Sequence, residues 1–383
     1  MGVDNFSYGS DLVGFFKAES TYGTAVKPVA GDAFRVTSIT MGAPVGRAFP
    51  GDLRGTRSRI EQTTTRTPVQ PWSAAGILRP SGTLGTAPDI GEIIKHAFGT
   101  ETVSGGTSVT YSLLKDPTAL SAAIYRSTSE VPPSLSEGVY GAIVQNLTFT
   151  WTGDSFITWT ATGVGKDYLQ TGNTLANGSG SSATALIVDD ADFYSPYSVI
   201  SVGSTDNVQV TAVNYTTNTL TIASSSWSDN DEVVPYVPTG TYAGDPLFGT
   251  AGSLSLDNGS TTITHLGGSI SVSTGIDLLN TEYGGASATD VTVPAYREVT
   301  GSLDFLVRKD EVMLFNEFRR NVQKDVIITL GDTAAKRMKI NCNITELAPS
   351  QRDSPDADMI RYTANLVALA SSSGEDEISL LFD

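Results

Sequence analysis

Ile157-Thr-Trp-Thr-Ala-Thr-Gly-Val164 has the same pattern as Ile360-Arg-Tyr-Thr-Ala-Asn-Leu-Val367, and this repeat is the strongest indication of the fold. Both follow the pattern Ile-x-aromatic-Thr-Ala-x-x-Val. Runs rich in Thr, Ile, Val and aromatic residues are typical of β-strands. A strand repeated this far apart in one chain predicts two related modules.

Three further matches lie upstream of these strands, in the same order in both halves of the chain. They are Asn146-Leu-Thr148 with Asn343-Ile-Thr345, Gly82-Thr-Leu84 with Gly301-Ser-Leu303, and an amphipathic helix after each of those glycines. The second copy has a longer hairpin tip at 351–358, which accounts for its larger spacing. Four matches in one order indicate an internal duplication.

One helix is predicted in each half. Residues 88–98 carry apolar side chains at positions 90, 93, 94, 97 and 98, the stripe of a helix packed on a sheet, and Gly99 follows. Residues 309–320 end on two arginines, at the negative end of the helix dipole. The apolar residues that we expect this second helix to bury are Val312, Leu314, Phe315 and Phe318.

The domain organisation follows from this duplication. We predict an N-terminal arm at 1–35, a first module at 36–170, a small acidic insert at 171–240 and a second module at 241–383. Each module is expected to form a β-sandwich or barrel with one helix, and the insert to be all-β, so the fold class is mainly β. The insert begins with a Gly/Ser/Asn-rich linker at 171–185, and Tyr215-Thr-Thr-Asn218 is its candidate hairpin turn.

Composition excludes several classes of protein. The 383 residues carry 24 Lys+Arg against 41 Asp+Glu, a net charge of −17, which disfavours binding to a phosphate backbone. A single cysteine, Cys342, excludes an intrachain disulfide framework. No run of about 18 apolar residues predicts a membrane span, and the acidic N-terminus does not resemble a signal peptide. We therefore expect a soluble protein made in the cytoplasm.

Catalytic and metal-binding motifs are not found, so we predict no catalytic, cofactor or metal site. His96 is expected on the solvated side of its helix, and His265 lies in a Thr-rich strand. Two acidic clusters are close enough in sequence to hold a cation, but they lack the glycine and glutamate of a calcium loop and are interpreted as turns. These clusters are Asp189-Asp190 with Asp192, and Asp229 with Asp231-Glu232.

Two charged loops are the candidate contact sites. Residues 46–66, the basic loop, have a local charge of +3, whereas residues 271–296, the acidic loop, have a local charge of −3. Both precede the Gly82 or Gly301 match, so we expect equivalent positions, with a basic loop of one subunit or ring meeting an acidic loop of the next. Two solvated loops are one alternative, and nucleic-acid binding by the arginines is another, which the acidity of the rest of the chain disfavours. The candidate contact residues are Arg47, Arg54, Arg57, Arg59 and Arg66 in the basic loop and Asp277, Glu282 and Asp290 in the acidic loop.

These features together resemble the tail tube, or major tail, proteins of long-tailed bacteriophages. The likeness rests on the arm with Glu19-Ser-Thr-Tyr-Gly-Thr24, the long loop, the Gly-Ser/Thr-Leu strand, the single helix and the closing hairpin, with 300–383 as the best-matching stretch. Members of that family form six-fold rings that stack into a tube for DNA. Because this chain has two modules, the resemblance implies three chains per ring.

The resemblance also implies partners and a location. The chain would bind other copies of itself in stacked rings, and it would contact a tape measure protein and tail tip or terminator proteins. No membrane is expected among its partners. DNA would pass through the lumen without specific binding. The protein would belong to the virion tail, assembled in the cytoplasm of the bacterial host. An acidic conduit suits this role, because it repels DNA instead of holding it.

Two other functions stay open at this point. A carbohydrate-binding or adhesin-like protein of a virion or cell surface would use the insert's aromatic residues as sugar platforms, although a small domain needs such residues for its core. These residues are Tyr194, Tyr197, Trp227 and Tyr236. A polysaccharide-degrading enzyme would need a pair of carboxylates at a set separation, and no pair is singled out.

Overall fold

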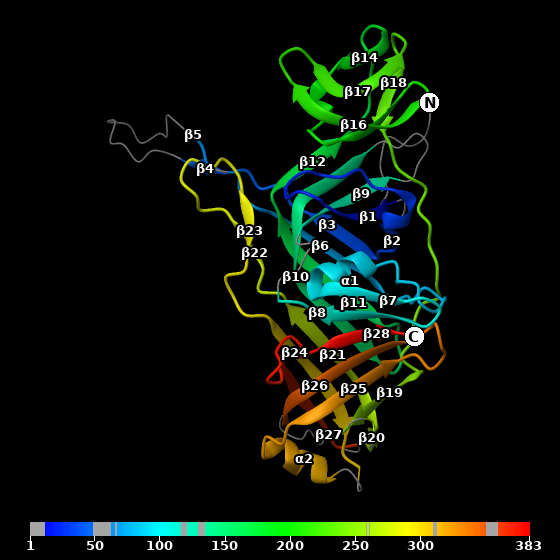
Figure 1. The fold of residues 1–383 in the computed structure, drawn as a ribbon, viewed down its shortest axis with the longest axis vertical. Helices are drawn as coiled ribbons and strands as arrows, with labels where there is room; N and C mark the ends of the chain where they lie inside the picture. The colour runs from blue at the N-terminus through cyan, green and yellow to red at the C-terminus, as the bar shows by residue number, and fades with distance from the viewer. Residues whose placement is uncertain are drawn as a thin grey trace, which may run out of the picture.

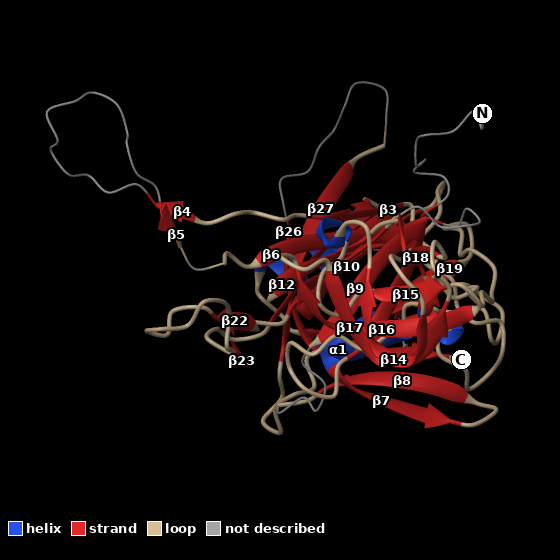
Figure 2. Ribbon diagram, turned by 90° about the horizontal axis from the view of Figure 1, so that it is seen from above, coloured by secondary structure: helices blue, strands red, loops and turns tan. Residues whose placement is uncertain are grey.

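The computed structural model confirms the mainly β fold (Figures 1 and 2). It describes residues 12–48, 63–65, 67–115, 121–128, 135–257, 259, 261–308, 312–349 and 359–383. In these residues the α-helices are α1 (Gly91–Phe98) and α2 (Val312–Arg319), which confirms one helix for each half. Neither helix is long and apolar enough to cross a membrane.

The first half of the chain forms two connected sheets. In one, the neighbours are β3, β6, β11 and β10; in the other, β2, β1, β9, the first part of β10, and β12. A hairpin of β7 and β8 follows α1, and β4 pairs with β5 in the long loop. The strands are β1 (Leu12–Ala18), β2 (Ala33–Phe34), β3 (Ser38–Met41), β4 (Arg47–Ala48), β5 (Thr63–Thr64), β6 (Gln70–Ile77), β7 (Gly99–Ser104), β8 (Ser108–Leu113), β9 (Ala122–Thr128), β10 (Ser136–Thr152), β11 (Thr158–Gly165) and β12 (Asp167–Thr171).

The last part of the chain repeats this topology strand for strand, except for the β7–β8 hairpin. One row is β21, β24, β27 and β26; the other is β20, β19, β25, the first part of β26, and β28. The strands are β19 (Gly252–Leu256), β20 (Thr261–Ile263), β21 (His265–Ser273), β22 (Asp277–Leu279), β23 (Asp290–Thr292), β24 (Glu298–Leu306), β25 (Lys324–Leu330), β26 (Met338–Pro349), β27 (Arg361–Leu369) and β28 (Ser379–Phe382).

Strand registers make the correspondence residue-specific. Adding 229 to the residue numbers of the β3–β6 pairs gives the β21–β24 pairs, so Thr40 opposite Ser73 matches Ser269 opposite Ser302. The same shift relates the two loop hairpins. Ala48 opposite Thr63 becomes Asp277 opposite Thr292, and each of these pairs encloses fourteen residues. The two long loops are therefore equal in length and equivalent in position.

Two of the sequence matches are wrong. Gly301 lies inside β24, where an added Cβ would approach the Ser269 carbonyl oxygen to 2.3 Å, whereas Gly82 lies in a turn with φ of 78°. The 229-residue shift places Trp72 of β6 at the position of Gly301. The two glycines therefore meet different steric constraints, close strand packing in one case and a left-handed turn in the other.

The Asn-x-Thr match is also out of register. Asn146 lies opposite Thr162, whose counterpart on β27 is Asn365, and Asn365 lies opposite Ala348. Asn343 is therefore not the equivalent of Asn146. The Ile157 and Ile360 strands do agree, since Trp159 and Tyr362 occupy the same buried position in β11 and β27.

The described part of the predicted arm belongs to the first module. β1 pairs with β9 over seven residues and with β2, just as β19 pairs with β25 and β20. The boundary at residue 35 is therefore not where the module begins, because 12–34 already contribute strands to its sheet.

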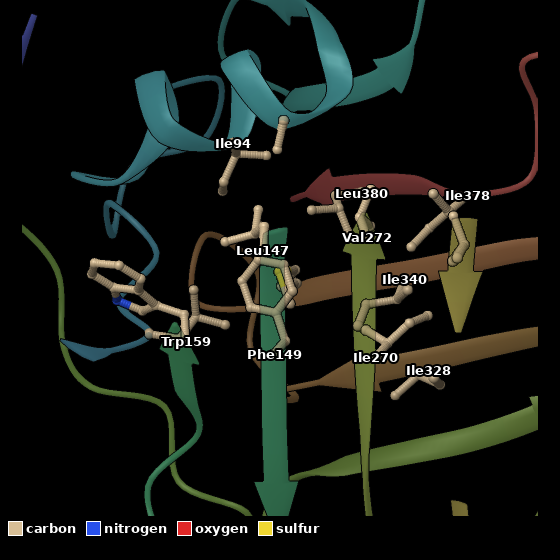
Figure 3. Packing of buried hydrophobic residues seen from close by; sticks show 14 of the residues in the cluster. Ile94, Leu147, Phe149, Trp159, Ile270, Val272, Ile328, Ile340, Ile378 and Leu380 are labelled. Atoms are coloured by element: carbon tan, nitrogen blue, oxygen red, sulfur yellow. The ribbon is translucent and has the colours of Figure 1, made fainter. Parts of the chain in front are cut away.

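One hydrophobic core runs through both modules (Figure 3). The β10–β21 pairing joins their sheets, and the side chains of Phe149 and Ile270 lie opposite each other across it. A second link comes from β8, which pairs with β28. Phe149 is 1% exposed and Ile270 fully buried, so the junction is as dry as the centre of either module.

The insert is all-β, as predicted, with a six-stranded sheet in the order β13-β18-β15-β16-β17-β14 and a core of its own. The predicted turn at 215–218 connects β16 to β17, with the Asn214 side chain accepting from the Thr216 backbone N–H. The strands are β13 (Thr174–Leu175), β14 (Gly180–Ile187), β15 (Val199–Val202), β16 (Thr205–Asn214), β17 (Thr219–Trp227) and β18 (Glu232–Pro235). Figure 1 shows the insert at one end of the molecule, beyond β12.

Candidate assembly surfaces

An eight-stranded antiparallel row is the dominant feature of the molecule. Its order is β3-β6-β11-β10-β21-β24-β27-β26, the four-strand unit of module one followed by that of module two. The seam between the units pairs β10 with β21 over seven residues, from Asn146 opposite Ser273 to Thr152 opposite Gly267. Module one thus presents its β10 edge, and module two its β21 edge, to each other.

The two ends of this row carry the same two edges without a partner. β3, the counterpart of β21, pairs only with β6 among the described residues. β26, the counterpart of β10, pairs with β27 along one edge of its last residues. β25 pairs with the opposite edge as far as Thr345, and no described strand pairs with that edge from Glu346 to Pro349. The β26 edge at one end of the row corresponds to β10, and the β3 edge at the other end corresponds to β21. The β26 edge of one copy could therefore pair with the β3 edge of the next, which is a head-to-tail contact.

One face of the row is apolar and forms the core, and the other face is covered with hydroxyl groups. On the second face the Thr40 and Ser73 hydroxyls are 2.8 Å apart, and those of Thr148 and Ser271 are also 2.8 Å apart. β3, β6, β11, β21 and the part of β10 from 143 to 152 contain no Asp, Glu, Lys or Arg. The other three strands of the row do carry charges on this face, namely Glu298 and Asp304 of β24, Arg361 of β27 and Glu346 of β26. From β3 to β21 this face is therefore polar and uncharged, whereas from β24 to β26 it carries charged side chains of both signs.

The acidic loop packs on module one of its own chain. Ile276 and Leu278 form a buried cluster with Ile143 of β10, and Val164 of β11 packs against this cluster. The Thr67 backbone N–H, just after the basic loop, donates to the Ala286 carbonyl at 2.8 Å. The end of the basic loop thus lies beside the middle of the acidic loop. Figure 1 shows the β4–β5 and β22–β23 hairpins projecting on the same side.

The structure brings the three acidic candidates together on one hairpin. Asp277 accepts from the Gln145 side-chain amide at 3.3 Å, and Asp290 lies opposite Leu279. Glu282 is exposed near the hairpin tip. All three residues are exposed, so this loop adds negative charge to the molecular surface.

Only one basic candidate can be placed. Arg47 is exposed in β4, opposite Thr64. The other four, Arg54, Arg57, Arg59 and Arg66, lie outside the described residues. The contact between a basic loop of one subunit or ring and an acidic loop of the next therefore stays a prediction.

The Glu19 motif fastens the N-terminal segment to β10. One carboxylate oxygen accepts from the Gly141 N–H at 2.8 Å, and the other accepts from the Gly23 N–H at 2.9 Å and the Ser121 hydroxyl at 2.8 Å. Burial raises the pKa of Glu19, although these hydrogen bonds oppose the shift. Lys166 lies over the Tyr22 ring at 5.4 Å. This motif is structural, and it supports the strand against which the acidic loop packs.

His96 is buried, which corrects the expectation of a solvated side chain. Its Nδ1 is 2.7 Å from the Glu92 carbonyl oxygen and its Nε2 is 3.3 Å from the Ser121 carbonyl oxygen. Phe16 of β1 covers the ring edge-on at 5.1 Å. The helix is thus covered on this side by a segment distant in sequence. His265 accepts a hydrogen bond from the Trp151 indole at 3.2 Å.

Stability is expected to fall as the solution becomes acidic. Burial lowers the pKa of both His96 and His265 below the ordinary 6.5. Below pH 6.5 each of these two histidines therefore binds a proton more readily in the unfolded chain than in the folded one, and each costs up to about 1.4 kcal/mol of unfolding free energy per pH unit. Urea unfolding at pH 7.5 and 5.5 measures this loss. The His96→Gln variant should show a flatter pH dependence, and an unchanged slope would contradict the assignment.

The acidic clusters of the insert serve as turns, as interpreted from the sequence. Asp190 accepts from the Asp192 N–H at 2.9 Å, and Asp231 accepts from the Ser228 N–H at 2.7 Å. Asp229 accepts from the Gly178 N–H at 2.6 Å. Within the described residues, no group of three or more His, Cys, Asp or Glu side chains could hold a metal ion.

The sequence did not identify three residues of module two that differ in exposure or chemistry from their module-one counterparts. Val367, the counterpart of Val164, is 42% exposed, and Tyr296, the counterpart of Thr67, is 94% exposed. Glu346 lies opposite Val367, as Ile143 lies opposite Val164. The Ile157 and Ile360 match already paired Val164 with Val367, but only the strand register shows what covers one and leaves the other exposed.

No protein-family model matches this chain, and no curated protein sequence matches it significantly.

Proposed function

We propose that this protein is a structural, non-enzymatic virion subunit that polymerises into stacked rings forming a bacteriophage tail tube. Three chains would make each ring, with six modules in pseudo-sixfold symmetry. The tube would conduct DNA into the host. Its partners would be further copies of itself, with a tape measure protein inside and tip or terminator proteins at the ends.

The observation that carries this proposal is the repeated four-strand row with complementary free ends. The β10–β21 seam shows how one module receives the next, and the unpaired β26 and β3 edges offer the same contact to another copy. Such a heterologous contact closes into a ring if the rotation between modules allows it. Ring closure would also cover the exposed edges, which are otherwise an aggregation hazard.

The hydroxyl-covered face suits the lumen of such a tube. DNA binds proteins mainly where Lys and Arg release the counterions of its phosphates. Because β3, β6, β11, β21 and the paired half of β10 carry no Lys or Arg, phosphates would find nothing there to hold them. The part of the lumen from β3 to β21 would let DNA slide because it has no cation to hold a phosphate, and Arg361 of β27 would be the cation nearest to it on module two.

No observation favours the carbohydrate-binding alternative. Tyr194 is 1% exposed and donates its hydroxyl to the Val233 carbonyl at 2.7 Å, and Trp227 is 8% exposed. Tyr197 stacks edge-on against Tyr140 of β10 at 5.2 Å. The rings of Tyr194 and Trp227 are therefore covered by protein and do not offer a flat platform to a sugar, whereas Tyr197 and Tyr236 are half-buried.

Removal of the insert should leave assembly intact. Thr174 and Val233 lie opposite each other in the β13–β18 pair, so a short Gly-Ser turn can replace the residues between them. The insert has its own core. Its contacts with module one include Tyr197 against Tyr140 and a hydrogen bond of 3.1 Å from Lys27 Nζ to the Asn207 carbonyl. Electron microscopy of the shortened and full-length proteins should show the same tubes. Loss of tubes in a shortened protein that still folds would mean that the insert takes part in assembly.

A further inference from the structure

The acidic loop packs on a surface of module one, here called the module-one seat, and module two has an equivalent surface, the module-two seat. In the module-one seat, Ile276 of the loop shares a buried cluster with Ile143, and Val164 and Val69 border this cluster. A backbone hydrogen bond of 2.8 Å from Thr67 to the Ala286 carbonyl fixes the far side of the loop.

The module-two seat lies at the equivalent place on module two. Val367 replaces Val164, and Glu346, opposite Val367 on β26, replaces Ile143. The 229-residue shift puts Glu298 at the position of Val69 and Tyr296 at that of Thr67. Nothing among the described residues covers Val367 or Tyr296, which are 42% and 94% exposed.

The loop that matches this seat is the basic loop, since it precedes β6 as the acidic loop precedes β24. The same shift makes Arg47 the counterpart of Ile276. By number alone it relates Arg57, which lies outside the described residues, to Ala286. Within its own chain the basic loop has no module on the β3 side to receive it, because β3 ends the row. A second copy would supply one.

We propose that the basic loop of one copy occupies the module-two seat of the next, with the Arg47 guanidinium on the Glu346 carboxylate. This inference rests on the proposed ring and names the contact that closes it. An apolar pair inside the chain, Ile276 with Ile143, is replaced between chains by an ion pair at the same position. Glu298 adds a second negative charge beside the seat.

This replacement sets the order of modules around the ring. An acidic loop seated on module two would bury the Glu346 carboxylate under Ile276 with only the neutral Gln323 amide, which donates to it at 3.3 Å, and no cation, which is costly. A basic loop seated on module one would bury Arg47 against Ile143, with the same penalty. Each loop therefore prefers one seat, and basic and acidic loops alternate around the ring.

Charge reversal with rescue is the test. Arg47→Glu and Glu346→Arg should each weaken association of the purified protein at least tenfold, measured by light scattering and by counting rings in negative-stain micrographs. The double variant, Arg47→Glu with Glu346→Arg, should restore association to within about threefold of the original. Lys115→Glu, an exposed reversal elsewhere, is the control and should change nothing. Thermal melting checks that every variant is folded.

Cysteine crosslinking gives an independent reading of the same contact. Thr67→Cys with Ala286→Cys should react with a short bismaleimide within one chain, leaving its mass unchanged on a denaturing gel. Arg57→Cys with Tyr296→Cys should instead yield covalent dimers and trimers. Cys342 is buried, so the original protein is the blank.

The outcomes separate this inference from the proposed function. Rescue by the double variant together with interchain crosslinks supports the seat. Rings that form in both single variants, or a double variant that stays dissociated, overturn the seat while leaving the tube proposal intact. An original protein that forms neither rings nor tubes under any condition overturns both.

Discussion

Replacing Phe149 with alanine is expected to lower the unfolding free energy by about 3–5 kcal/mol, the cost of removing a large ring from a packed core. Phe149 is 1% exposed at the seam between the modules, where it lies between Trp159 of β11 and Ile270 of β21 (Figure 3). A loss of this size approaches the total stability of many domains. Urea unfolding measures it directly.

Thr150→Ala is the matched control, because Thr150 follows Phe149 on the same strand but points to the exposed hydroxyl face. That substitution should change stability by less than about 0.5 kcal/mol. Because one core spans both modules, tryptophan fluorescence and far-UV circular dichroism should report the same loss for Phe149→Ala. A change below about 1 kcal/mol would mean that the modules do not depend on a shared core.

Reversing two arginines of the basic loop is expected to abolish assembly without unfolding the monomer. Arg54→Glu with Arg57→Glu changes the loop's local charge from +3 to −1, so its attraction to the acidic loop of another copy becomes repulsion. Charge contacts of this kind weaken with salt, so the original protein should itself assemble less well as the ionic strength rises. Sedimentation of tubes at several salt concentrations measures both effects.

The control keeps the same overall charge. Lys95→Glu with Lys115→Glu also makes the net charge of −17 more negative by four. These substitutions lie on α1 and after β8, away from both loops. This variant should assemble normally. If the loop variant assembles as well as this control does, the docking role assigned to the basic loop is wrong.

Local patterns sufficed for the elements but not for all of their correspondences. The helix stripe at 88–98 and the turn at 215–218 depend on neighbours in sequence, and both were predictable. The Gly82 match failed because glycine is used both in tight turns and inside crowded strands, and sequence does not tell these apart. Register, which separates Asn146 from Asn343, is set by pairing with distant strands.

The candidate surfaces were predictable in charge but not in position. The basic and acidic loops were visible as local compositions, and their equal length follows from the printed sequence once the hairpin registers are known. The burial of His96 was not predictable, because Phe16 and Ser121 approach it from other segments. Nor was the hydroxyl face, since alternation alone does not say which strands stand side by side.

Electron microscopy of the concentrated, purified protein tests the central claim most directly. The account predicts hollow filaments built from rings of three chains, with six similar modules around the lumen and three copies of the insert per ring. Class averages of single rings should show threefold symmetry with a pseudo-sixfold inner wall. A monodisperse monomer at every concentration and salt condition, or rings without a central channel, would contradict it.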